Sequence, residues 1–301
     1  MKKLTKDHSF YAFGPNLTPA LTIESDETIM LETHDCFEGQ LKSENDTLDT
    51  LDWDHINPAT GPVYIQNAEP GDILKVQLLD VKPVDYAKLA VIPGEGALGD
   101  WLDQPDVAFL KNGETELTLK NRYHLQPKPM IGVIGVAPAD RSIPNGTPDN
   151  HGGNMDCKEI GSGTTLYFKV NVPGALLGAG DVHSVMGDGE VLICGAETPA
   201  EITLTATVIK ANTLADLPTP FFETDQVYAL ISAAPSLDQA VKNVNRGMLD
   251  FLTKTVGLPA NDAGMLMTTV GDLKFCQIVD PQVTVRFEFP KYVLADIGFT
   301  L

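Results

Sequence analysis

Three segments of the sequence concentrate side chains that bind metal ions. They span residues 32–36, 148–156 and 181–190, and they contain three of the six histidines of the chain. Each segment also carries carboxylates beside its histidine, and two of the three contain glycines, which allow a ligand or a backbone to approach closely. A mixed set of histidine and carboxylates suits zinc with one open coordination position, or another divalent cation.

The segment 181–190 is the most informative of the three. Asp181 and His183 are two residues apart, so both side chains point the same way on an extended strand. The sequence Gly-Asp-Gly at 187–189 is typical of a tight turn, and Glu190 then leads into an apolar run that predicts a strand over 191–196. This pattern places Glu190 at the rim of a sheet. The alternative is that the turn is only structural and Glu190 is a solvated strand end.

The other two segments are more ambiguous. His34 and Asp35 are adjacent, so on a strand they face opposite sides and at most one of them enters a given site. The segment 148–156 is rich in ordinary loop formers, and His151 there could be a surface residue.

Sequence patterns for nucleophilic catalysis are weak. The chain has no HExxH, no GxSxG, no Ser-Ser dipeptide and no Walker lysine after the glycines near residue 161. Cys157 directly follows Asp156 and could act as a nucleophile with His151 as its base. A buried and inert thiol is the alternative. The four cysteines form no CxxC pair, which excludes zinc-finger and thioredoxin-type sites.

The elements that must position these side chains are mainly strands. Residues 201–208 alternate between threonine or glutamate and apolar side chains, which is typical of a half-buried strand, and 74–78 alternate in the same way. Asn112-Gly113 between two apolar runs predicts a hairpin. Further short strands are expected at 28–32, 131–136, 165–170, 227–232, 276–279 and 283–289.

Helices are expected only near the C-terminal side. Ser236 with Gln239 three residues later resembles a capping box, and the helix after it ends at Gly257 and Pro259. A shorter helix is expected over 261–269. We therefore predict a mainly β fold, with a β-sandwich or jelly-roll-like body and a few helices on the C-terminal side. No flexible linker divides the chain, so we expect one domain over residues 1–301.

Charge and hydropathy limit the partners. The chain has 21 basic and 41 acidic residues, a net charge of −20, which disfavours nucleic acid and anionic membranes. The acidity either keeps the surface soluble or reflects carboxylates that converge on a cation. No apolar run is long enough to cross a bilayer, and charged residues interrupt the start where a signal peptide needs an apolar stretch. We expect a cytoplasmic protein with reduced thiols.

Several segments in order along the chain resemble the acetamidase/formamidase family. They are residues 57–64, 68–76, 151–156, 172–177 and, most strongly, 180–190. Met155 stands where an aliphatic residue is expected. The resemblance implies a β-rich fold, dimeric or higher homo-oligomeric assembly, and hydrolysis of short amides such as formamide or acetamide to ammonia and a carboxylate. It also implies divalent metal ions, with Asp35, Asp156 and His183 as first choices for metal ligands. From the donor types we expect zinc, with calcium a candidate second ion.

These residues are compatible with a metal-assisted mechanism. Glu190 is the first candidate for moving a proton from water to the leaving nitrogen, and His151 is the second. Asn154 could hydrogen-bond the substrate or the oxyanion. Two other hypotheses stay open: a non-catalytic β-sandwich that binds a cation or carbohydrate, with calcium held for structure only, and an amidase with a Cys157 nucleophile.

Overall fold

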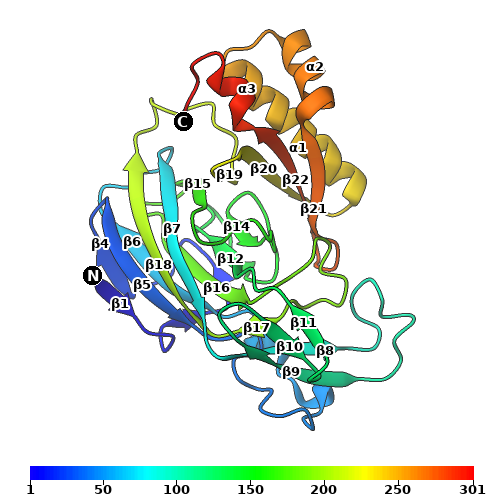
Figure 1. Cartoon of the computed structure of the whole chain (residues 1–301). Coiled ribbons are helices and arrows are strands. Elements are labelled where there is room, and N and C mark those ends of the chain that lie inside the picture. Colours follow the sequence, from blue (N-terminus) through cyan, green and yellow to red (C-terminus); the bar gives the residue numbers. More distant parts are fainter.

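The computed structural model describes residues 1–301, and β-strands are its main regular elements (Figure 1). Strands form two large sheets and one two-stranded sheet. The nine-stranded sheet runs in the order β1 (Lys2–Leu4), β5 (Glu27–Thr33), β18 (Ala200–Ile209), β7 (Ile73–Pro83), β15 (Thr165–Lys169), β19 (Phe221–Glu223), β20 (Val227–Ala234), β22 (Val283–Pro290) and β21 (Asp272–Gln277).

The second sheet has eleven strands and carries most of the chemistry described below. Its main path is β11 (Tyr123–Leu125), β10 (Leu117–Leu119), β9 (Asp106–Asn112), β8 (Tyr86–Val91), β17 (Glu197–Thr198), β16 (Leu177–His183), β12 (Met130–Gly135) and β14 (Gly152–Asn154). β6 (Ala59–Ile65) pairs with β16, β2 (Ser9–Phe10) and β4 (Leu21–Ile23), while β3 (Ala12–Phe13) and β13 (Ile143–Pro144) form the small sheet.

The two large sheets share one hydrophobic core of 32 buried residues. Both sheets contribute to it, for example through Leu31 and Ile202 of the first sheet and Ile131 and Ala179 of the second. The predicted alternation is confirmed in β18, where every second side chain from Ala200 to Ala206 is buried. Burial of such period-two faces between two sheets stabilises a sandwich. The predicted mainly β fold is therefore confirmed.

The helices gather at one end of the molecule, as expected. They are α1 (Leu237–Asp250), a π-helical turn η3 (Phe251–Thr255), α2 (Ala260–Val270) and α3 (Lys291–Ala295), and they lie beside β20, β22 and β21 (Figure 1). The Ser236 side chain accepts a hydrogen bond from the Gln239 amide, so the predicted N-cap is confirmed. A second core of 17 buried residues joins these helices to the sheet.

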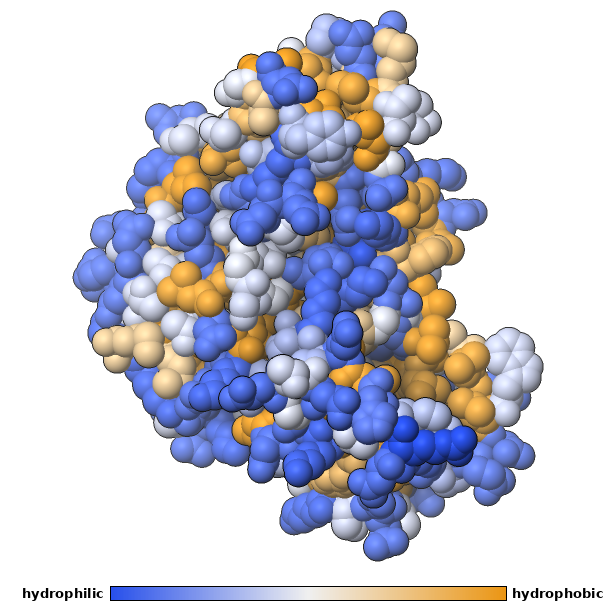
Figure 2. All heavy atoms as spheres, viewed as in Figure 1, coloured by the Kyte–Doolittle hydropathy of each residue, from blue (hydrophilic) through white to orange (hydrophobic).

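The exterior matches the acidic composition. Hydrophilic side chains cover much of the face in Figure 2, and hydrophobic ones gather towards the upper end and along the right-hand edge. No helix combines the length and apolar character required to cross a bilayer.

Residues 191–196 do not form the predicted strand, and this expectation was wrong. The chain turns there instead, because Glu190 and Ile193 adopt left-handed backbone angles, with φ of 46° and 74°. Pairing resumes only at β17. The predicted strand over 276–279 also stops early, since the Gln277 side chain accepts hydrogen bonds from the amides of Val279 and Asp280 and turns the chain. Both irregular segments line the site described next.

Candidate metal centre and active-site cavity

His183 lies at the centre of a group of buried carboxylates. It is the last residue of β16, and antiparallel pairing places it directly opposite Glu197 of β17. Its Nε2 atom lies 3.1 Å from Oε1 of Glu197 and 3.4 Å from Oδ1 of Asp181. The sheet register therefore brings together side chains that are fourteen residues apart along the chain.

Two further carboxylates complete the group from loops. Asp156 follows β14, and Glu190 follows the Gly-Asp-Gly turn; each has an oxygen 3.9 Å from Nε2 of His183. Asp156, His183 and Glu190 form one set whose ligand atoms all lie within 4.8 Å of one another. Cys36, Asp181 and Glu197 form a second such set.

Backbone strain marks the same residues. Asp156, Asp181 and Glu190 have φ values of 44°, 53° and 46°, in the left-handed region that residues with a Cβ atom rarely adopt. Strain of this kind costs of order 1–3 kcal/mol per residue and concentrates at functional sites. The backbone conformation that turns these three carboxylates towards one histidine therefore lowers the local stability.

Gly132 of β12 provides the space in which two of these carboxylates meet. A Cβ atom at Gly132 would lie 2.3 Å from Oδ1 of Asp156 and 2.3 Å from Oδ2 of Asp181. Gly195 leaves space for the ring of His183 in the same way, because a Cβ atom added at Gly195 would lie 2.4 Å from Nδ1 of His183. Glycine is required at both positions for the group to pack as it does.

Buried polar atoms without partners indicate that the group is suited to a cation. Both oxygens of Asp156, both ring nitrogens of His183 and one oxygen each of Asp181 and Glu197 are buried and make no hydrogen bond. Unpartnered buried polar atoms are costly, so native proteins rarely leave several together. A divalent cation would satisfy these atoms at once, and the histidine–carboxylate donor set fits zinc.

The titration behaviour points the same way. Burial, together with the neighbouring carboxylates, raises the pKa of Asp156 and of Glu190 well above their ordinary values. Burial also raises the pKa of Glu197 to about 8. Burial lowers the pKa of His183, but Glu197 and Asp181 outweigh it and the net shift is upward. Positive charge is therefore favoured in the middle of this group.

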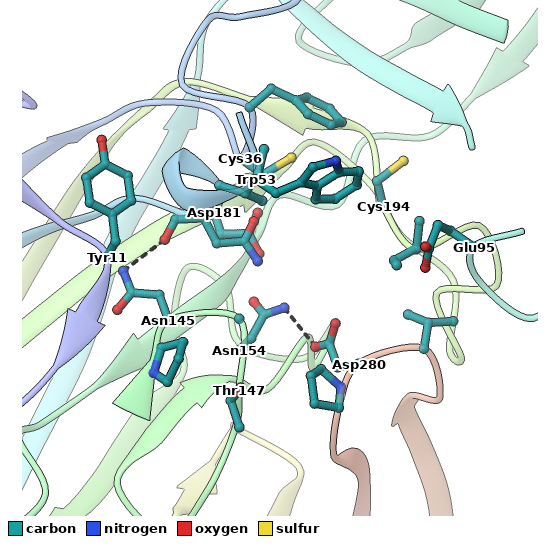
Figure 3. A pocket seen from close by; sticks show the side chains of 18 of the residues that line it. Tyr11, Cys36, Trp53, Glu95, Asn145, Thr147, Asn154, Asp181, Cys194 and Asp280 are labelled. Carbon is teal, nitrogen blue, oxygen red and sulfur yellow. Dashed lines mark hydrogen bonds between the residues drawn. The ribbon is translucent and has the colours of Figure 1, made fainter. Parts of the chain in front are cut away.

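A cavity of about 790 Å³ opens beside the group (Figure 3). Asp181, Glu190 and Glu197 line it, and so do Asn154 and Asp280, whose side chains are joined by a 2.8 Å hydrogen bond from Nδ2 of Asn154. Burial raises the pKa of Asp280 to about 7. The cavity thus brings solvent and small molecules to the carboxylates that surround His183.

Comparison with known proteins agrees with the resemblance seen in the sequence. The model of the acetamidase/formamidase family matches residues 2–143 and 134–233. The chain belongs to this family. The crystal structure of an acetamidase from Bacillus halodurans is 38% identical, with a TM-score of 0.96 over 99% of this chain and 100% of that one. A recombinant predicted acetamidase/formamidase from the thermophile Thermoanaerobacter tengcongensis is also 38% identical, with a TM-score of 0.95 over 100% and 99% of the two chains.

The curated relatives match only part of this chain. The acetamidase of Mycolicibacterium smegmatis is 25% identical over a match that covers 60% of this chain and 61% of that protein. The chain spans less than two thirds of the length of the curated relatives it matches.

Within this family fold, four of the six residues singled out in the sequence lie at or next to the cavity, and two of them, Glu190 and Asn154, line it. Asp156, His183 and Glu190 form one set, and Asn154 lines the cavity beside them. The amide group of Asn154 already donates to Asp280, and its Oδ1 is buried without a partner. The free atom is therefore a hydrogen-bond acceptor, which suits a substrate N–H better than an oxyanion.

Asp35 lies outside both sets. Its carboxylate accepts hydrogen bonds from the amides of Phe37 and Gly39 and from the ammonium of Lys88, whose Nζ lies 2.9 Å away. Lys88 and Asp35 are both buried, so this is an internal ion pair. It places Cys36, the next residue, beside Asp181 and Glu197. The oxygens of Asp35 are thus already bound by Lys88 and by backbone amides, and Asp35 holds the neighbouring Cys36 in place.

His151 also lies apart from the group. Its ring packs edge-on against Phe13, 5.2 Å between centroids, and it does not line the cavity. Burial lowers its pKa to about 4, so the ring is neutral over most of the pH range. Gly153 leaves room for this ring, since a Cβ atom there would lie 3.1 Å from Nε2 of His151.

Cys157 is completely buried in the shared core, as is Cys276. It does not line the cavity. A nucleophile must reach the substrate, so this placement does not support the Cys157 hypothesis.

Sequence reasoning missed three members of the site. The pattern at 181–190 marks Asp181 as metal-capable but does not single it out as a ligand, and no pattern points to Glu197 or Asp280. Glu197 lies just beyond an apolar run and Asp280 precedes a proline, and neither position carries a recognisable motif. Only the pairing of β16 with β17 and the turn after β21 bring them to the cavity.

Proposed function

We propose that this protein is a metal-dependent amidohydrolase that cleaves the C–N bond of short linear amides, such as formamide or acetamide, to ammonia and a carboxylate. The observation that carries the proposal is the buried set of unpartnered carboxylate and imidazole atoms around His183, next to a cavity that Asp181, Glu190 and Glu197 line, in a chain of the acetamidase/formamidase family. We infer zinc as the ion, because a histidine among carboxylates favours it over calcium, which prefers oxygen ligands only.

The ligands that fit best are Asp156 and His183, with Asp181 and Glu197 as further donors. The second set, which adds Cys36, offers room for a second ion, for which calcium is a weaker choice because of the thiol. Asp35 is not kept as a ligand, because its oxygens are bound to Lys88 and to backbone amides.

A bound divalent cation lowers the pKa of water towards about 7 and polarises a carbonyl. Proton transfer and orientation of the substrate are left to the side chains of this protein. Glu190 lines the cavity, and its raised pKa allows it to accept a proton from water and donate it to the leaving nitrogen. Oδ1 of Asn154 would accept a hydrogen bond from the substrate NH₂ group and so orient the amide. His151, which does not reach the cavity, is not needed for this sequence of steps.

The proposal extends to the organisation of the chain. We propose that residues 1–301 form one acetamidase/formamidase-like domain that assembles as a homodimer or higher homo-oligomer in the cytoplasm. The net charge of −20 disfavours nucleic acid as a partner.

Ammonia release from formamide and acetamide tests the activity, before and after exhaustive chelation and with zinc, manganese or calcium added back. We expect activity to disappear on chelation and to return with zinc. Activity that survives chelation and is lost in Cys157→Ser would instead favour the cysteine mechanism. Calcium binding without any ammonia release would favour a non-catalytic cation-binding sandwich.

A further inference from the structure

We propose that the cavity beside His183 is built for a neutral amide that carries an apolar group of several carbons, and that Trp53 forms the wall that contacts this group. The inference rests on the proposed amidohydrolase function and names the substrate class of the same site. It is carried by the volume of the cavity, the residues of its walls and the sign of its charges.

The volume is far greater than the smallest amides require. The cavity measures about 790 Å³, within the range of roughly 300–1,000 Å³ that is typical of sites for drug-sized ligands. Formamide has only three non-hydrogen atoms, and a water molecule occupies about 30 Å³ in the liquid. A site holding formamide alone would remain mostly filled with water, which is poorly suited to holding so small a substrate in one orientation.

The walls away from the carboxylates are apolar. Ten of the 23 residues that line the cavity are hydrophobic. The larger ones come from separate parts of the chain: Phe37, Trp53, Ile56, Ile92, Ile193 and Val279. Apolar walls of this kind stabilise a bound hydrocarbon group by removing its surface from water.

The charges of the lining exclude anions. The lining contains six acidic residues and no lysine, arginine or histidine, the acidic ones being Asp54, Glu95, Asp181, Glu190, Glu197 and Asp280. A bound divalent cation, and protons on the carboxylates whose pKa is raised, would offset part of this charge, but nothing in the lining makes it positive. A substrate with a free carboxylate would therefore be repelled, whereas a neutral amide would not.

Trp53 is placed to contact the apolar group. Its ring lies over the cavity on the side of Cys36 and Cys194, above Asp181 (Figure 3). The side chain is 54% exposed although it lines the cavity, so much of its apolar surface is free to be covered by a ligand.

The turn that carries Trp53 is held firmly. Trp53 begins the short helix η2 (Trp53–His55). The side chain of Gln40 makes three hydrogen bonds to the backbone of this turn. It accepts one from the Asp52 amide at 2.7 Å and donates to the carbonyls of Asp52 and His55. The ring of His55 packs against Tyr11, which also lines the cavity. The backbone that carries Trp53 is thus fixed before a ligand binds, which reduces the entropy lost on binding.

A homologous series of amides tests the proposal. We expect kcat/KM to rise from acetamide to hexanamide by up to about fourfold per methylene, the value of burying one CH₂ group, and by at least about tenfold in total. Pentanamide should exceed succinamate, in which a carboxylate ends the chain, by at least about tenfold. In Trp53→Ala the ratio of kcat/KM for hexanamide to that for acetamide should fall by about tenfold.

Trp101 provides the matched control. It is the only other tryptophan, is 77% exposed and does not line the cavity, so Trp101→Ala should leave the hexanamide-to-acetamide ratio unchanged. A ratio that is unchanged in Trp53→Ala, or a kcat/KM that falls from acetamide to hexanamide in the unchanged protein, would overturn the proposal while leaving the amidohydrolase function intact.

A binding measurement separates this proposal from the proposed function. In Trp101→Phe, Trp53 is the only tryptophan, and its fluorescence should change saturably with hexanamide in the metal-loaded protein. If the fluorescence changes but no amide is hydrolysed, the proposal that the cavity binds apolar ligands stands and the amidohydrolase function is refuted. No fluorescence change and no hydrolysis of hexanamide would refute the apolar ligand class.

Discussion

At the scale of single residues, the site is defined by negative charges that share one histidine. Asp156, Asp181, Glu190 and Glu197 each have an oxygen within 4 Å of Nε2 of His183. Like charges at such distances cannot all be ionised without a compensating cation. The residues therefore divide into those that would hold the ion and those that would move protons.

Glu190 allows this division to be tested. We expect Glu190→Gln to lower kcat for acetamide by about 10²- to 10⁴-fold, because the amide cannot accept a proton from water. Zinc content measured on the same samples should stay close to one ion per site. The exposed Glu116 is the control, since Glu116→Gln removes a carboxylate that is 53% exposed and far from the lining of the cavity.

Two results would contradict the shuttle role of Glu190. Near-full turnover with bound metal would remove Glu190 from the reaction. Loss of both metal and activity would make Glu190 a ligand together with Asp156 and His183, which their mutual distances also allow.

At the scale of elements, one loop is held in place by two strands of the other sheet. The loop that carries Glu190 follows β16 and contains Asp188, which Arg286 of β22 binds through two contacts of 2.7 and 3.0 Å. The Gly189 amide donates to the carbonyl of Cys276 in β21, and the Ile278 amide donates to the carbonyl of Gly189. The nine-stranded sheet thus anchors a loop that follows β16 of the eleven-stranded sheet.

Replacement of Arg286 tests this anchor. Its side chain is completely buried and also binds Glu288, with Nε 2.6 Å from Oε1. We expect Arg286→Met to reduce the free energy of unfolding in urea by about 3 kcal/mol, because Asp188 and Glu288 lose their buried partner. Each of the two carboxylates keeps one lysine contact, from Lys158 and Lys274. Activity should fall as well, since Glu190 loses its fixed position.

The control is an arginine in an exposed pair. Arg246 is 71% exposed and contacts Asp250 one helical turn away, so Arg246→Met should change the stability by less than about 0.5 kcal/mol. An Arg286→Met protein as stable and active as the unchanged one would show that the loop is held by its backbone contacts alone.

At the scale of the whole molecule, the fold buries several carboxylates close together. Burial disfavours their charged form unless a cation is bound, so the folded state favours protonation of these groups or binding of a cation. In the metal-free protein burial raises the pKa of Glu197 to about 8 and that of Asp280 to about 7, both far above the values of an unfolded chain. The folded state then binds more protons than the unfolded state in this range. Stability of the metal-free protein must fall as the pH rises through 7 and 8.

This linkage predicts a pH-dependent effect of the metal. Between pH 6.5 and 8 the melting temperature of the metal-free protein should decrease, and the increase on adding zinc should be larger at pH 8, because the ion replaces the protons. His151, with a pKa lowered to about 4 by burial, adds an opposite trend only below about pH 6.5. Thermal scans with and without zinc at both pH values measure the effect.

Glu197→Gln is the control for this assignment. It removes the carboxylate with the pKa near 8, so the decrease in stability of the metal-free protein between pH 6.5 and 8 should become smaller. A zinc-induced increase in melting temperature that is equal at both pH values would show that these carboxylates are not its ligands.

Local pattern was sufficient for much of the fold. The alternation along residues 201–208 predicted β18, and the cap at Ser236 predicted the start of α1, because strand and helix periodicity are properties of neighbouring residues. Local pattern failed at 191–196, where an apolar run suggested a strand. The left-handed angles at Glu190 and Ile193 depend on contacts with other segments, and apolar composition carries no information about them.

For the site, residue types and spacing were enough to identify Asp156, His183 and Glu190 as metal-capable residues in glycine-rich segments. Which other carboxylates join them depends on how the chain folds. Asp35 is bound instead by Lys88, 53 residues away, and Glu197 reaches His183 through strand pairing. The physical reason is that charges interact across space, over a few ångströms set by sheet register and loop anchoring, and not along the chain.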